Sequence, residues 1–122
     1  MRTFKRIAAS MFVMLLGTAS LVAAPSTANA DASCPYLRLC IWDGFNYNGA
    51  KEYLFECKLI NIGEFGWSDR TKSFKNNQSP GTVATFFNWD GQKWVYLDRS
   101  VAPGFIPVVN FPIRTTDAIQ VC

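Results

Sequence analysis

The sequence contains no histidine among its 122 residues. Without an imidazole, the Ser-His-Asp and Cys-His catalytic groups, histidine general bases and histidine-ligated zinc are all excluded. The remaining candidates for acid–base catalysis are carboxylates. They are scattered along the chain, mostly beside turn residues. A glycosidase-type pair could still form in space, but solvated loop carboxylates explain the pattern better. The sequence therefore predicts a protein that is not an enzyme.

Long apolar runs are lacking except near the N-terminus, where residues 7–24 are mostly apolar. A basic head precedes this run, and the small-residue site Ala28-Asn29-Ala30 follows it; the head contains Arg2, Lys5 and Arg6. This order is typical of a secretory signal peptide. An N-terminal membrane anchor is the weaker alternative, because Pro25 and the cleavage site follow without a basic stop-transfer cluster. We expect cleavage after Ala30 and a secreted protein.

The remainder, 31–122, lacks an excess of either charge. Three of the 12 basic residues lie in the signal peptide, which leaves nine basic and nine acidic residues in a segment of 92 residues. Runs of Lys and Arg are also absent from this segment. A basic nucleic-acid-binding surface is therefore not expected, nor is a membrane partner after cleavage. The length predicts one small domain, and we expect a monomer.

All four cysteines lie in this segment: Cys34, Cys40, Cys57 and Cys122. An even number of cysteines in a short exported chain indicates disulfides. Four cysteines allow three connectivities. The turn-favouring Pro35 after Cys34 favours a short Cys34–Cys40 loop, which leaves Cys57–Cys122 as the second bridge. A metal site is a poor alternative, because no C-x₂-C spacing and no histidine are present.

Helical periodicity is also lacking beyond residue 31. Apolar residues occur in short runs separated by Gly, Pro, Asn and Asp, which predicts an all-β sandwich or barrel. The expected strands are 39–42, 52–55, 73–75, 82–87, 94–97 and 118–121. The Pro-containing stretch 98–114 shows no clear alternation and is expected to be a fixed loop.

Two copies of one unit are indicated by internal similarity. The segment Gly49–Leu54 resembles Gly91–Tyr96 at an offset of 42 residues. Phe74-Lys75-Asn76 likewise precedes Ala118-Ile119-Gln120 by 44 residues. Each copy is too small to bury its own apolar face, so the two must pack together. We place the repeats at approximately 34–78 and 79–122.

Several motifs together resemble the peptidase inhibitors of family I36, which are exported proteins of streptomycetes and relatives. The matching segments are Cys34-Pro35, Leu39–Asp43, Asn46–Gly49, Asp69–Asn76 and Val101–Gly104. The resemblance covers nearly all of 34–122. It implies a fold similar to a single βγ-crystallin domain, with two Greek-key motifs packed as a sandwich, which here would be stapled by disulfides.

The resemblance implies that this protein inhibits an extracellular protease through exposed, rigid loops, since ordering a flexible loop would consume binding energy. The family's reactive loop carries its own disulfide, and no cysteine lies between residues 58 and 121 here, so the inhibitory bond cannot be transferred. The alternative is a non-inhibitory extracellular module of the βγ-crystallin type, structural or ligand-binding, with calcium as the candidate ligand. The candidate inhibitory or binding loops contain Asn88, Trp89, Asp90, Gly91, Gln92, Asp98, Arg99, Ser100, Val101, Ala102, Pro103 and Gly104.

Calcium binding, which the βγ-crystallin motif can provide through a D/N-D/N-x-x-S/T-S segment, is not expected. The first copy, 68–73, has Lys72 at a ligand position, and the second, 113–117, lacks the leading acidic pair. We therefore predict no metal and no cofactor.

The aromatic residues are mostly at strand-like spacing, which favours core packing. Trp89 and Trp67 are the exceptions, because both lie among turn residues. Exposed aromatic side chains of this kind could bind glycans or single-stranded nucleic acid.

Overall fold

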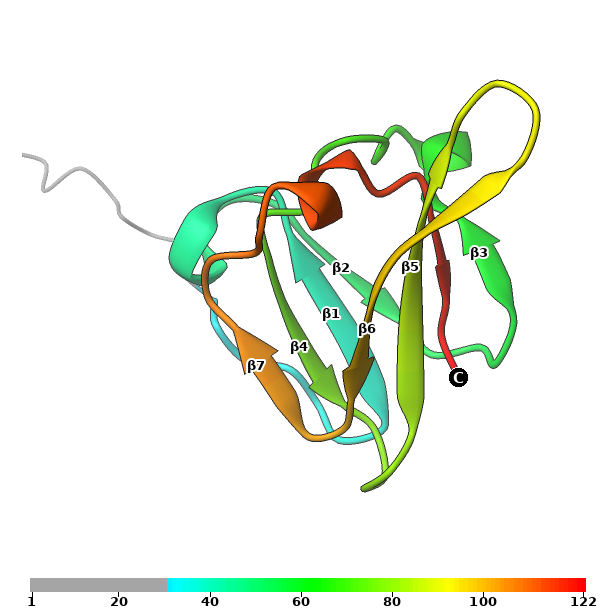
Figure 1. Ribbon diagram of the computed structural model, residues 1–122. Helices are drawn as coiled ribbons and strands as arrows, with labels where there is room; N and C mark the ends of the chain where they lie inside the picture. The colour runs from blue at the N-terminus through cyan, green and yellow to red at the C-terminus, as the bar shows by residue number, and fades with distance from the viewer. Residues whose placement is uncertain (1–30) are drawn as a thin grey trace, which may run out of the picture.

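The computed structural model describes residues 31–122, and the predicted signal peptide lies outside this range. Short runs of apolar residues between turns form β-strands, and three short 3-10 helices occupy the connections (Figure 1). The strands are β1 (Arg38–Trp42), β2 (Lys51–Leu54), β3 (Leu59–Asn61), β4 (Ser73–Asn77), β5 (Val83–Trp89), β6 (Trp94–Val101), β7 (Gly104–Ile106) and β8 (Ala118–Gln120). The 3-10 helices are η1 (Phe45–Tyr47), η2 (Ile62–Phe65) and η3 (Pro112–Thr115). Across 31–122, no helix is long and apolar enough to cross a membrane.

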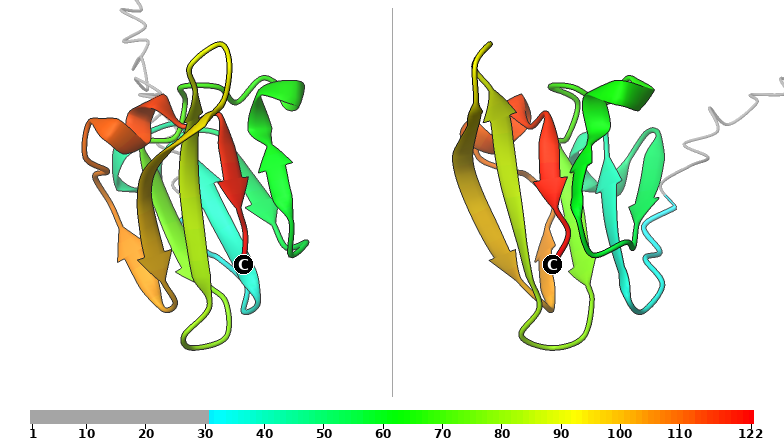
Figure 2. Two further views of the ribbon diagram at one scale, coloured as in Figure 1. Left: turned by 45° about the vertical axis from the view of Figure 1, so that its right-hand side comes forward. Right: turned by 90° about the vertical axis from the view of Figure 1, so that its right-hand side faces the viewer.

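The strands form two four-stranded antiparallel sheets that face one another (Figure 2). One sheet has the order β2-β1-β4-β7 and the other β3-β8-β5-β6. If β1, β2, β3 and β4 are matched with β5, β6, β7 and β8, the second order, read from β6, is the same as the first. Each half of the chain thus places three strands in one sheet and its third strand in the other. The prediction of an all-β sandwich of two Greek-key motifs is confirmed.

The core lies between the two sheets, where the inward-facing apolar residues of both sheets meet. Phe74 of β4 and Phe86 of β5 are almost fully buried, and their ring centroids lie 4.9 Å apart. This contact joins the two sheets directly. Both halves of the chain supply the rest of the cluster: Leu39, Ile41, Leu54, Ile62, Trp67, Ala84, Val109, Ile113, Ile119 and Val121.

The stretch 98–104 is not the loop that we expected from its sequence. Residues 98–101 continue β6, where Asp98, Arg99 and Ser100 pair with Phe86, Thr85 and Ala84 of β5. Ladder pairing holds these polar residues extended, so apolar alternation is not required. Only Ala102 and Pro103 form the connection, and Gly104 begins β7. The short strands β3 and β7, each three residues long, were likewise missing from the sequence prediction.

Both predicted disulfides are present, and the described chain contains no free cysteine. Cys34–Cys40 links the segment before β1 to the middle of that strand, whereas Cys57–Cys122 ties the chain between β2 and β3 to the last residue. Disulfides of this kind indicate an oxidising environment.

Residues before β1 cover part of the outer face of the first sheet. The indole nitrogen of Trp42, a fully buried residue, donates a hydrogen bond to the backbone carbonyl of Asp31 at 3.0 Å. Lys51 reaches the Asp31 carboxylate at 2.7 Å and also the carbonyl of Ser33. The hydrogen bond from Lys51 lowers the pKa of Asp31 to about 2. This segment therefore completes the burial of Trp42.

Candidate functional site: a tryptophan-lined cleft

The hairpin of β5 and β6 projects beyond the rest of the sandwich (Figures 1 and 2). Its tip is ordered by one carboxylate: Oδ1 of Asp90 accepts the backbone N–H groups of Gln92 and Lys93, both at 2.8 Å. Hydrogen bonds from Lys93 and then Gln92 lower the pKa of Asp90. Gly91 has φ of +95°, a value that a residue without a side chain adopts at no steric cost. Local chemistry thus fixes this turn without a disulfide.

Two tryptophans flank the turn as a cross-strand pair. Trp89 ends β5 and Trp94 begins β6, and their rings lie 4.9 Å apart at an angle of 61°. Edge-to-face contacts of this kind stabilise a hairpin beyond the area they bury. Trp89 nevertheless remains 46% exposed, as its sequence context predicted. The pair therefore presents an ordered indole surface to solvent.

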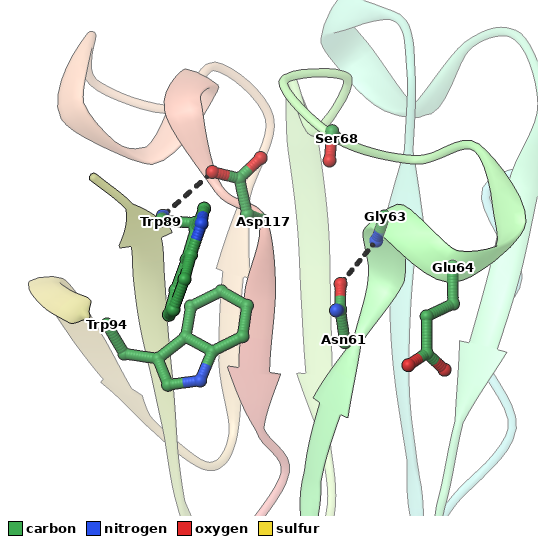
Figure 3. Close-up of a pocket in the computed structure, with 7 residues that line it drawn as sticks. All are labelled: Asn61, Gly63, Glu64, Ser68, Trp89, Trp94 and Asp117. Carbon is green, nitrogen blue, oxygen red and sulfur yellow. Dashed lines mark hydrogen bonds between the residues drawn. The ribbon is translucent and has the colours of Figure 1, made fainter. Parts of the chain in front are cut away.

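This indole surface forms one wall of a cleft of about 540 Å³. Figure 3 shows the two indoles on one side with Asp117 above them, and Asn61, Gly63 and Glu64 on the other side with Ser68 above Asn61. The opposite wall comes from the end of β3, from η2 and from the residues just after it. A cleft of this size with aromatic and polar sides suits a small ligand or one segment of a polymer.

Asp117 fixes the hairpin to the body of the domain. Its backbone N–H donates to the carbonyl of Phe87, and its Oδ2 accepts the N–H of Trp89, both at 2.8 Å. The β5–β8 pairing ends at Phe87 and Ala118, and the Asp117 side chain adds one more hydrogen bond to β5 beyond that point. Its second carboxylate oxygen remains available as an acceptor. Burial, and then the nearby Asp117 charge, raise the pKa of Asp69, so this end of the domain carries closely spaced negative charge.

The polar wall is arranged by a side-chain cap on η2. Oδ1 of Asn61 accepts the N–H of Gly63 at 3.0 Å, which leaves the Asn61 NH₂ group for other partners. Gly63 permits close packing here, because a Cβ atom would lie 2.6 Å from Oγ of Ser68. The cleft therefore combines donors, from Asn61 and Ser68 of this wall, with acceptors, from Glu64 of this wall and from Asp117 beside the indoles.

The structure separates the two candidate loops of the sequence. Trp89 from the 88–92 segment lines the cleft, whereas residues 98–104 lie elsewhere. Asp98, Arg99 and Ser100 border a separate, smaller depression. Asp98 also accepts a hydrogen bond from the amide of Asn110. A role in binding for either segment stays a prediction.

Of the seven residues that line the cleft, the sequence-predicted loops contain Trp89 alone; the six that they missed are Asn61, Gly63, Glu64, Ser68, Trp94 and Asp117. Trp94 could have been found, because strands that flank a short turn place their end residues opposite each other. Nothing in the sequence brings Asn61 or Asp117 to the same place. The prediction that Trp67 is exposed was wrong: it is 4% exposed and packs in the core, with Arg70 stacked 4.6 Å from its ring centroid.

No family model matches the sequence, and no curated protein matches it. Solved structures do match the fold. The βγ-crystallin domain from Clostridium beijerinckii superposes with a TM-score of 0.54 at 14% identity, covering 68% of this chain and 94% of that one. The βγ-crystallin from Ciona intestinalis gives a TM-score of 0.51 at 15% identity, with coverages of 68% and 96%. The N-terminal domain of protein S gives 0.50 at 13% identity, with coverages of 68% and 92%.

The fold is that of a βγ-crystallin domain. In this βγ-crystallin fold, the segment 68–73 has structural roles. The buried Ser73 donates to the carbonyl of Gly44 and accepts the N–H of Tyr47, which ties β4 to the connection between β1 and β2. Arg70 forms an ion pair with Asp43 at 2.7 Å. Lys72 lies over the ring of Phe45, 5.8 Å from its centroid.

We predict that calcium binds no tighter than roughly the millimolar range of weak extracellular modules. Lys72 and Arg70 repel a divalent cation, and a calcium site needs several oxygen ligands. Within 31–122, no group of three or more Asp, Glu, Cys or His side chains could hold a metal. Calorimetry on chelator-treated protein tests this prediction, and the melting temperature should be unchanged by calcium. Saturable micromolar binding would contradict it.

Proposed function

We propose that the protein is a non-enzymatic extracellular binding module that holds its ligand in the cleft between the Trp89–Trp94 pair and the Asn61–Ser68 wall. The observation that carries this proposal is the ordered, exposed indole pair, fixed by Asp90 and Asp117 opposite a polar wall. An apolar surface left in water costs stability that burial would recover. Pre-organised aromatic surface with a few polar groups is the usual composition of a ligand site.

Calorimetric titration with probes of four chemical classes tests the proposal: a neutral oligosaccharide, a polyamine, a single-stranded oligonucleotide and a short acidic peptide. At least one class should bind the wild-type protein. Binding should weaken by roughly tenfold or more when Trp89 and Trp94 are both replaced by alanine, as for aromatic residues at the centre of binding sites.

The matched control is Tyr36→Ala. Tyr36 is also an aromatic residue, 60% exposed, but it lies in the Cys34–Cys40 loop, at the end of the sandwich opposite the hairpin (Figure 1). This variant should bind normally. If none of the four classes binds, or if Tyr36→Ala weakens binding as much as the double variant, the proposal is wrong.

Protease inhibition is a second candidate function, and the projecting, carboxylate-ordered turn at 90–93 favours it. Inhibitors need a rigid loop that enters a protease cleft, because ordering a flexible loop costs binding energy. Asp90 supplies that rigidity where the resembling inhibitor family has a disulfide. The assignment to peptidase inhibitor family I36 rests on the sequence resemblance alone, as does an extracellular protease as partner.

A panel of secreted metalloproteases and serine proteases tests the second candidate. The wild-type protein should inhibit at least one of them, and Asp90→Ala should weaken inhibition because both turn hydrogen bonds are lost. Asn110→Ala, which alters a polar contact away from the turn, is the control. An absence of inhibition at large molar excess would rule out the inhibitor function.

A further inference from the structure

We infer that the ligand of the cleft is a neutral sugar, held as a pyranose ring of an oligosaccharide or polysaccharide. This inference rests on the proposed function, since it names the ligand class of the same site. Two properties of the cleft carry it: the pairing of indole faces with hydrogen-bonding groups of both kinds, and the sign of the charge around it.

The indole wall provides surface for the apolar side of a sugar ring. An aromatic face carries negative charge density, and the C–H groups of a pyranose, made slightly positive by adjacent oxygens, fit against it. Trp89 is close to half exposed, and Trp94 lies edge-to-face with it. The two indole rings meet at 61° and form an angled surface rather than a flat one. A pyranose ring placed in this angle can contact both indoles.

The polar wall matches hydroxyl groups better than it matches ions. The NH₂ group of Asn61 can donate to a ligand, while its oxygen already accepts the N–H of Gly63. The free oxygen of Asp117 and the Glu64 carboxylate can only accept. A sugar hydroxyl both donates and accepts, so neighbouring hydroxyls can satisfy the two kinds of group at once.

Charge disfavours the other ligand classes. The lining residues include Glu64 and Asp117 but no Lys or Arg, so phosphate groups and acidic peptides are repelled. An amine would be attracted to the carboxylates and to the indole faces, but it cannot accept the hydrogen bond from Asn61. Polyamines are therefore the serious competitor, and the experiment must separate them from sugars.

The test is calorimetric titration of the full protein with cellohexaose, chitohexaose and spermine, using wild type and three variants. Asn61→Asp keeps the acceptor that caps η2 but removes the amide donor and adds a negative charge. Asp117→Asn keeps an acceptor for Trp89 but removes the charge. Trp94→Ala removes one indole. Circular dichroism and urea unfolding verify that each variant is folded, and Tyr36→Ala is again the control.

At least one of the two oligosaccharides should bind. Trp94→Ala should weaken that binding by roughly tenfold or more, and Asn61→Asp should weaken it by about three- to tenfold, the effect of one lost hydrogen bond. An amine ligand would respond to Asn61→Asp in the opposite direction, because the added carboxylate attracts it.

The outcomes separate the inference from the function on which it rests. If spermine binds and its affinity rises in Asn61→Asp while neither oligosaccharide binds, the sugar inference is overturned and a binding function for the cleft stands. If sugar binding is unaffected by Trp94→Ala, the inference is also overturned, because the sugar then binds elsewhere. If no probe of any class binds, both proposals fail.

Discussion

Replacing Cys57 and Cys122 together by alanine should lower the free energy of unfolding by about 4 kcal/mol. The bridge spans a sequence separation of 65 residues, so it removes much of the freedom of the unfolded chain. Both cysteines are exposed, which means that little packing is lost with the sulfur atoms. For a domain of this size, the melting temperature should fall by roughly 16–32 °C.

Urea unfolding of the wild type and the double variant measures this effect. The matched comparison is the Cys34→Ala, Cys40→Ala variant, whose loop has a sequence separation of only 6. Loop entropy alone predicts about 2 kcal/mol there, although Cys40 is fully buried and its loss also affects packing. An unchanged unfolding free energy in the Cys57/Cys122 variant would show that the bridge does not restrain the unfolded chain as the model of loop entropy requires.

Replacing Phe86 by alanine should cost about 3–5 kcal/mol, the usual effect of removing a buried phenylalanine. Phe86 has no exposed surface, and its ring packs against Phe74 of the opposite sheet. The substitution therefore removes buried area and also the contact between the sheets. Phe86→Leu, which keeps most of the volume, should cost less than about 1.5 kcal/mol.

Thermal and urea unfolding measure the cost, with Phe111→Ala as the control because Phe111 is 72% exposed. A surface substitution of this kind should change stability by no more than about 0.5 kcal/mol. Equal effects at Phe86 and Phe111 would contradict the inter-sheet core as the main source of stability.

Turn residues and short apolar runs were enough to predict the sandwich and most of its strands. Asp43-Gly44 and Asp90-Gly91 mark turns by conformational preference alone, and the strands on either side of them follow. The even number of cysteines and the position of Pro35 likewise predicted the disulfide pairing, because ring closure over a short loop depends on local geometry. The exposure of Trp89 was predicted from its turn neighbours for the same reason.

Features that depend on pairing between different segments of the chain could not be predicted from the sequence. Residues 98–101 form a strand because β5 lies beside them, and β3 forms against β8 although only three residues pair. Trp67 has turn neighbours like those of Trp89, yet η2 turns it into the core. Its burial was decided by the path of the chain, which the sequence near Trp67 does not reveal.

The sequence by itself determined the fold class, the disulfides and the lack of histidine chemistry, because these follow from local conformational preference and from residue content. The tertiary structure alone decided the cleft. Asn61 and Asp117 come from opposite halves of the chain and meet the indole pair only because β3 crosses into the sheet formed by β5, β6 and β8. Hydrogen bonds along those ladders, rather than any motif, bring the polar wall opposite the tryptophans.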